Sequence, residues 1–180
     1  FPYLSIAIHT ALTDEVGARA MEAAGVDTAM MDVIGADATI REVYHLDRPV
    51  ADFEATLAAL TATRMKVSPH IVIGLHYGRV LGEPTALDIV SRYPVEALVL
   101  VVVMPFYAAP GLFAVPDAAE VGRIFGEARL RLHDRQVLLG CARPPGLHKR
   151  AVDAYAVMAG LDGIAFPADG VVSVARAIGR

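Results

Sequence analysis

Six short apolar segments recur along this chain, and a stretch with helical character follows each of them. The segments are rich in Val, Ile and Leu, which is typical of parallel strands packed between layers. They lie at residues 3–9, 27–34, 67–74, 97–104, 136–141 and 163–166. Pro49, Pro84 and Pro116 stand where a first-turn proline opens a helix. Strands that alternate with amphipathic helices predict an α/β fold with a parallel sheet and helices outside it.

The connections that follow the strands are longer and more polar than those that precede them, which favours a (β/α) barrel over an open sheet. A dinucleotide-binding sheet should show G-x-G-x-x-G after its first strand, but residues 9–12 read His-Thr-Ala-Leu. A complete barrel needs about 250 residues. The 180 residues supply six strand–helix units. We therefore expect one domain over residues 1–180, a partial (β/α) barrel of the TIM-like type.

Composition excludes several classes of partner. The net charge is −4 and no basic run occurs, so we expect no nucleic-acid binding. The longest apolar run, residues 97–104, is far shorter than the ~20 residues a bilayer requires, and we expect that strand to be covered on both faces. A single cysteine, Cys141, excludes an internal disulfide framework and a cluster held by several cysteines of this chain. A cytoplasmic location follows as an expectation.

Residues 66–83, KVSPHIVIGLHYGRVLGE, combine a strand with a glycine-rich polar connection. Ligand sites in barrels are built from such strand-to-helix connections. His9, His70 and His76 each lie at or near the end of a strand and could converge there. Their spacing matches no zinc signature, so the sequence does not favour a metal triad.

Four segments together carry a resemblance to a known family: PHIVIGLHYGRVLGE, LVLVVVMP, LLGCARPPG and AGLDGIAFP. They resemble the later strands of radical S-adenosylmethionine (SAM) enzymes of the biotin synthase-like group, which includes a component of a two-protein lipoyl synthase. The resemblance implies that the chain corresponds to strands three to eight of that barrel. CxxxCxxC, which binds the [4Fe-4S] cluster in this group, is missing. We expect that the chain is truncated upstream of Phe1, or that it is a degenerate partner that binds no cluster.

The same resemblance implies a SAM site. Ile73, Gly74 and Leu75 would contact the adenine, Asp32 would accept the ribose hydroxyls, and Arg41 would pair with the methionine carboxylate. Simpler roles stand beside these. A glycine at position 74 suits a turn, the carboxylate can cap a helix or pair with an arginine, and the arginine can be solvated.

Cys141 and Arg143 fall where the group places ligands of an auxiliary iron–sulfur cluster or contacts to substrate. If the strand continues, alternation turns both side chains to the same face. A lone cysteine that only packs is the alternative.

The intact protein would then use SAM and a [4Fe-4S] cluster to form a 5′-deoxyadenosyl radical, abstract hydrogen and insert sulfur, as lipoyl and biotin synthases do. Its partners would be a small-molecule or acyl-carrier substrate and a second radical SAM subunit. Phe106 and Tyr107 make the connection after residues 97–104 apolar, which suits an acyl chain.

Two other functions remain open. One is an iron-independent β/α-barrel enzyme acting on a phosphorylated small molecule, with residues 165–170 before the last helix as the anion site. The only lysines, Lys66 and Lys149, are poorly placed for a Schiff base. The other is a non-catalytic barrel subunit that supports an active partner.

Overall fold

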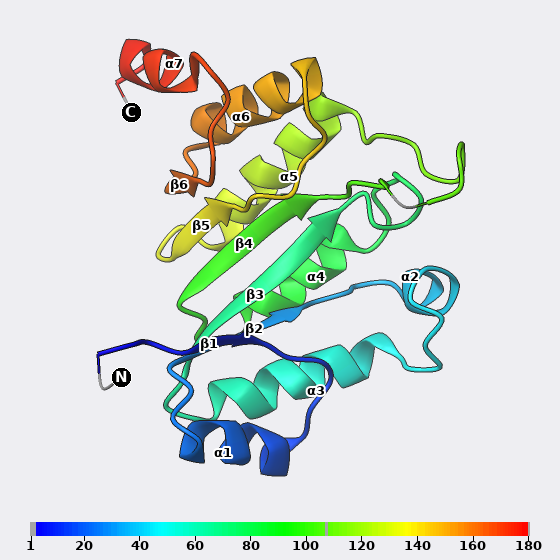
Figure 1. Cartoon of the computed structure of the whole chain (residues 1–180), viewed down its shortest axis with the longest axis vertical. Coiled ribbons are helices and arrows are strands. Elements are labelled where there is room, and N and C mark those ends of the chain that lie inside the picture. The colour runs from blue at the N-terminus through cyan, green and yellow to red at the C-terminus, as the bar shows by residue number, and fades with distance from the viewer. Residues whose placement is uncertain (1–2, 107, 180) are drawn as a thin grey trace.

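The computed structural model describes residues 3–106 and 108–179, so Tyr107 of the predicted apolar connection lies outside the described residues. Six strands form one parallel sheet in chain order, as Figure 1 shows. They are β1 (Ala7–His9), β2 (Thr28–Asp32), β3 (Lys66–Ile73), β4 (Ala97–Val102), β5 (Gln136–Leu139) and β6 (Gly163–Ile164). The helices are α1 (Glu15–Ala23), α2 (Asp37–Glu42), α3 (Val50–Thr61), α4 (Glu83–Ser91), α5 (Ala118–Arg131), α6 (Leu147–Ala159) and α7 (Val171–Ala177). The predicted α/β fold, a partial (β/α) barrel, is confirmed.

Helices cover one face of the sheet, and the core lies between them and the strands. Burial alternates along β3, where Val67, Ile71 and Ile73 belong to the core. The side chains between them are less buried and point to the opposite face, which we call the inner face. The same alternation leaves Val99 and Val101 of β4 half-buried. The expectation that this strand is covered on both faces is therefore wrong, because the sheet does not close on itself within the described residues.

The polar connection that follows the predicted strand 27–34 contains the six-residue helix α2. Gly35 brings this segment against the start of α4. A Cβ at Gly35 would lie 2.1 Å from the carbonyl oxygen of Gly82 and 2.5 Å from the amide nitrogen of Ala86. Only a residue without a side chain allows this approach, so the connections after β2 and β3 pack directly together.

The connections at the carboxyl ends of the strands also hold one another by hydrogen bonds. Thr39 Oγ1 lies 3.2 Å from His76 Nδ1, and the hydroxyl of Tyr77 donates to the carbonyl of Glu42 at 3.0 Å. The amide of Ala114 donates to the carbonyl of Tyr77 at 3.1 Å, and His148 Nε2 donates to the carbonyl of Pro116 at 2.7 Å. These bonds link the connections after β2, β3, β4 and β5 into one rim, which fixes the end of the sheet where barrels place their sites.

No helix among the described residues has both the length and the apolar character needed to cross a bilayer.

Candidate functional site

Polar side chains occupy the inner face where the first three strands approach their carboxyl ends. Asp32 is the last residue of β2 and pairs in register with His70 of β3. His9 is the last residue of β1 and pairs with Met30, which lies two residues before Asp32. Paired residues of neighbouring strands share a face, and so do residues two apart on one strand. His9, Asp32 and His70 therefore project to the same side of the sheet.

Tyr44 completes this group from the connection between α2 and α3. Its hydroxyl donates to Asp32 Oδ2 at 3.1 Å, and His9 Nε2 lies 3.5 Å from Asp32 Oδ1. The rings of His9 and His70 have their centroids 5.3 Å apart, and His70 Nδ1 lies 3.2 Å from the carbonyl oxygen of Ser68. We call His9, Asp32, Tyr44 and His70 the Asp32 cluster. It contains an acceptor, a hydroxyl donor and two imidazoles.

Burial shifts the pKa of two members of the Asp32 cluster, His70 and Tyr44. Burial lowers the pKa of His70 below its usual 6.5, and the neighbouring His9 lowers it further, while Asp32 acts in the opposite direction. Burial also raises the pKa of Tyr44, and the nearby charge of Asp32 adds to that effect. At neutral pH the cluster therefore holds a neutral imidazole at position 70 and a protonated phenol at position 44.

A cavity of about 290 Å³ adjoins the Asp32 cluster. Its walls come from the end of β2, from the connections after β1 and α2, and from α3. The lining residues are His9, Thr10, Ala11, Leu12, Met31, Asp32, Tyr44, Leu46 and Phe53. Most of this wall is apolar, and its polar side chains are Thr10 and three members of the cluster, His9, Asp32 and Tyr44; His70 is not among the lining residues.

Residues 73–75, the predicted adenine contacts, interact with neighbouring groups of the protein itself. Ile73 is fully buried in the core. Gly74 has a φ of +78°, its amide donates to Glu83 Oε1 at 2.7 Å, and a Cβ there would lie 2.2 Å from Pro116. The geometry matches the simpler role, a glycine required by a turn. Leu75 packs against the core.

Glu83, which the sequence did not single out, shapes the connection after β3. Its carboxylate is buried and accepts from the amides of Gly74 and Leu81, the latter at 2.8 Å. Both oxygens are thus used to hold the loop. An acidic residue directly before a first-turn proline is the only sequence signal for this role.

Arg41 is exposed on α2, and Cys141 is exposed beyond the end of β5. Since β5 ends at Leu139, strand alternation does not extend to Cys141 and Arg143, and the argument that turned both inward fails. Their proposed roles as cluster ligands or substrate contacts stay predictions.

Arg143 is instead fully buried against Asp153 of α6. Its Nε donates to Asp153 Oδ1 at 2.5 Å, and its terminal nitrogens donate to the carbonyls of Gly140 at 2.6 Å and Ala165 at 2.7 Å. Asp153 Oδ2 accepts from the amide of Ala168 at 2.7 Å. This arrangement joins the connections after β5 and β6 to α6. The sequence could not indicate it, because nothing marked Asp153 as the partner.

The three histidines considered together do not converge. His9 and His70 are neighbours, but His76 lies in the rim beside Thr39. Within residues 3–106 and 108–179, no group of three or more His, Cys, Asp or Glu side chains is placed to hold a metal ion.

Fold and site together define an α/β protein with a partial barrel and a polar cluster on its inner face. No protein-family model and no curated protein matches the sequence. Among solved structures, the chain is similar to a hydroxymethylglutaryl-CoA lyase from Pseudomonas aeruginosa, with a TM-score of 0.53 and 13% identity. The likeness covers 77% of this chain and 45% of the lyase, so the chain spans less than half of that protein. At this identity the likeness shows the fold alone.

The resemblance to radical SAM enzymes of the biotin synthase-like group is wrong on these comparisons. No family model carries it, the solved structure named above is a lyase, and the described residues offer no metal-holding group. The physical reason lies in the segments that suggested it. An apolar strand followed by a glycine is what many parallel β/α units need at a strand end, as Gly74 illustrates. The SAM-binding roles of Asp32, Arg41 and residues 73–75 lose that basis and stay predictions.

Proposed function

We propose that this chain belongs to a β/α-barrel enzyme that moves a proton to or from a small molecule at the Asp32 cluster. The observation that carries the proposal is the contact of Asp32 with both Tyr44 and His9, beside His70, on the inner face. Barrel enzymes place their chemistry at this end of the strands. A carboxylate, imidazoles and a phenol within reach of one another are the groups that general acid–base catalysis uses.

The members of the cluster take different roles in this proposal. His70 is neutral at neutral pH because burial lowers its pKa, so it can accept a proton from a substrate carbon or hydroxyl. Asp32 orients the substrate by accepting from its hydroxyl groups and stabilises the imidazolium that forms at His9 or His70. Tyr44 keeps its proton and holds Asp32 in place.

A phosphorylated substrate is not part of this proposal. The anion site was expected at residues 165–170 before the last helix. There the amide of Ala168 donates to Asp153, and the carbonyl of Phe166 accepts from Lys149 Nζ at 2.6 Å. The amide of Ala168 and the ammonium group of Lys149, two donors that could bind a phosphate there, thus donate to other groups of the protein.

The proposal is tested by hydrogen exchange at carbon. The protein is incubated in D₂O with a set of hydroxyaldehydes, hydroxyketones and 3-hydroxy acids, and NMR detects deuterium next to the carbonyl. We expect exchange in at least one compound, and a loss of about 100-fold or more in Asp32→Asn. Asp134→Asn, an exposed carboxylate in the turn before β5, is the matched control and should exchange like the original protein. Equal exchange in both variants, or none in any compound, would refute a proton-transfer role and favour the non-catalytic reading.

A further inference from the structure

We infer that the cavity beside the Asp32 cluster binds a neutral alcohol with a compact apolar group. The hydroxyl would lie at Asp32 and the apolar group would fill the cavity. This inference rests on the site of the proposed function and names the class of ligand that the site takes.

The size of the cavity limits the apolar group. A closed apolar cavity of roughly 150 Å³ holds a benzene molecule. The cavity here measures about 290 Å³ and opens to solvent, so it has room for a six-membered ring with a short substituent. A long chain would extend past Leu46, which is 40% exposed.

The walls of the cavity favour an apolar group. Phe53 and Met31 are core residues that present part of their surface to the cavity, and Leu12 packs against the same core. These side chains offer no hydrogen bond to a polar ligand. Removing apolar surface from water contributes roughly 25 cal/mol per Å² buried. Contact with this wall therefore supplies affinity, while the polar end supplies orientation.

Asp32 has an oxygen available for the ligand's hydroxyl. Its Oδ2 accepts from Tyr44 at 3.1 Å, whereas the contact of Oδ1 with His9 Nε2 is 3.5 Å, longer than a typical hydrogen bond. The side chain of Asp32 is 30% exposed, so a ligand can reach it. A hydroxyl can donate to Oδ1 and form a charge-assisted bond.

Charge distinguishes the alcohol from related ligands. A carboxylic acid with the same ring would bring a second negative charge next to Asp32, and like charges a few ångströms apart repel each other. An ammonium group would be attracted to Asp32 but would lose the hydration of its charge on entering the cavity. The neutral hydroxyl is not repelled by the charge of Asp32 and has no charge whose hydration would be lost.

Titration with three probes that share one ring tests the inference: cyclohexylmethanol, cyclohexanecarboxylate and cyclohexylmethylamine, each followed by ¹⁵N NMR of the full chain. We expect the alcohol to shift the amides of residues 10–12, 32 and 44–46 at concentrations of about 1 mM. The carboxylate should bind at least about tenfold more weakly. In Asp32→Asn that difference should shrink, because the charge is removed and an acceptor oxygen stays.

Two alanines provide matched variants. Ala11 lines the cavity, and Ala11→Phe should abolish the shifts because the ring occupies the space. Ala55 is exposed on α3 outside the cavity, and Ala55→Phe should bind like the original protein. Denaturant midpoints verify that both variants fold.

The inference is overturned if the alcohol shifts no amide of the lining residues, if the acid or the amine binds as tightly as the alcohol, or if Ala11→Phe binds unchanged. Its failure is distinct from that of the proposed function. Binding without deuterium exchange in any compound refutes the catalytic role alone, and exchange without alcohol binding refutes the ligand class alone.

Discussion

Arg143 and Asp153 form a buried ion pair whose remaining hydrogen bonds go to the backbone of two connections. Arg143→Met would leave the carboxylate of Asp153 buried without its cation. Such a loss costs about 3–5 kcal/mol of unfolding free energy, which equilibrium denaturation by urea measures. Arg150→Met, on the exposed side of the same helix α6, should change stability by less than about 0.5 kcal/mol. A change in unfolding free energy well below this range in Arg143→Met would show that water reaches the carboxylate of Asp153.

His70 makes stability depend on pH. Burial lowers its pKa in the folded state below the usual 6.5, so the folded chain binds this proton more weakly than the unfolded chain does. The stabilising contribution is complete above pH 6.5 and is lost as the pH falls through the folded-state pKa. We expect the unfolding free energy of His70→Asn to decrease less than that of the original protein between neutral and mildly acidic pH.

The control for this experiment is His133→Asn, an exposed histidine in the turn between α5 and β5, which should follow the original protein. His9 and Asp32 both lie beside His70 and act on its pKa, so the comparison is repeated in His9→Asn. Parallel pH curves for His70→Asn and the original protein would contradict the lowered pKa.

Two glycines of α5 separate packing from intrinsic helix propensity. A Cβ at Gly122 would lie 2.7 Å from the ring of Tyr155 on α6, whereas nothing lies within 4 Å of a Cβ at Gly126. Gly122→Ala should therefore destabilise by about 1–3 kcal/mol, because the ring must move. Gly126→Ala should stabilise by about 0.5–1 kcal/mol. Thermal unfolding measures both, and stabilisation by both substitutions would mean that α5 and α6 do not pack this closely.

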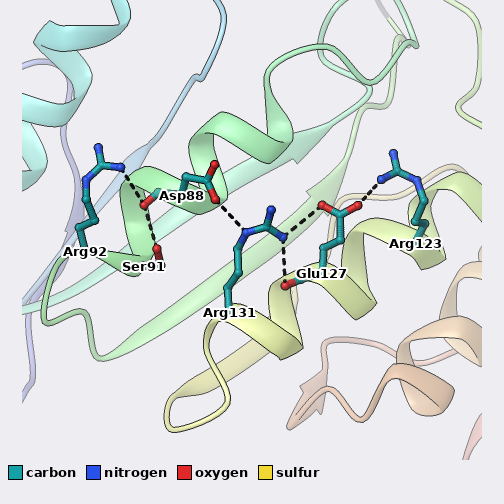
Figure 2. A network of polar contacts seen from close by, with 6 residues as sticks. All are labelled: Asp88, Ser91, Arg92, Arg123, Glu127 and Arg131. Atoms are coloured by element: carbon teal, nitrogen blue, oxygen red, sulfur yellow. Dashed lines mark hydrogen bonds and ion pairs between the residues drawn. The ribbon is translucent and has the colours of Figure 1, made fainter.

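A network of charged side chains joins α4 and α5 on the outer surface, as Figure 2 shows. Arg131 donates to Asp88 of α4 at 2.9 Å and to Glu127 of its own helix at 3.2 Å, and Glu127 also pairs with Arg123. The pairs are partly exposed, so Arg131→Ala should cost less than about 1 kcal/mol.

Most of the loss of unfolding free energy in Arg131→Ala should disappear at about 1 M salt, where the Debye screening length is roughly 3 Å. Denaturant unfolding at low and high salt, with an uncharged denaturant, measures the change. If Arg131→Ala lowers the unfolding free energy by the same amount at both salt concentrations, Arg131 stabilises the protein by packing of its aliphatic stem and not by its charge.

At the scale of the whole molecule, the sequence predicted the positions of the six strands but not all of their ends, since β1 and β6 are shorter than the expected 3–9 and 163–166. It predicted the contacts at the site poorly. The segment expected at 67–74 is β3 (Lys66–Ile73), because apolar strand residues are a local signal. Helix α2 has only six residues and no side chain caps its start, so it gave no comparable signal.

The Asp32 cluster was predicted only in part. Asp32 was singled out, and His9 and His70 were expected near a common strand end. Tyr44 reaches Asp32 only because α2 and its connection return the chain to the sheet, which no local pattern encodes. His76 was considered together with the other histidines, but it lies beside Thr39, where Gly35 and Gly82 approach closely. Contacts between residues distant in sequence depend on the packed fold.

The order of the strands predicts how stability is distributed over the sheet. Strands β3 and β4 have hydrogen-bonded neighbours on both sides, while β1 and β6 lie at the two edges and β6 has only two residues (Figure 1). Amides in the centre should therefore exchange only through global unfolding, and those at the edges through local opening. In native-state hydrogen exchange, we expect Ile71 and Leu100 to show the largest protection and Ile164 a free energy of opening lower by several kcal/mol.

Denaturant dependence separates the two kinds of opening, because global unfolding exposes much more surface than fraying of an edge. The amides of Ile71 and Leu100 should follow the m value of global unfolding, and the amide of Ile164 should depend little on denaturant. If Ile164 were as protected as Leu100, the β6 edge would be held by contacts beyond its own pairing with β5, such as the bonds from Arg143 to the connection after β6. Arg143→Met would then lower the protection of Ile164 by more than the loss of global stability that Leu100 reports, and comparison of the two amides in that variant would locate the constraint.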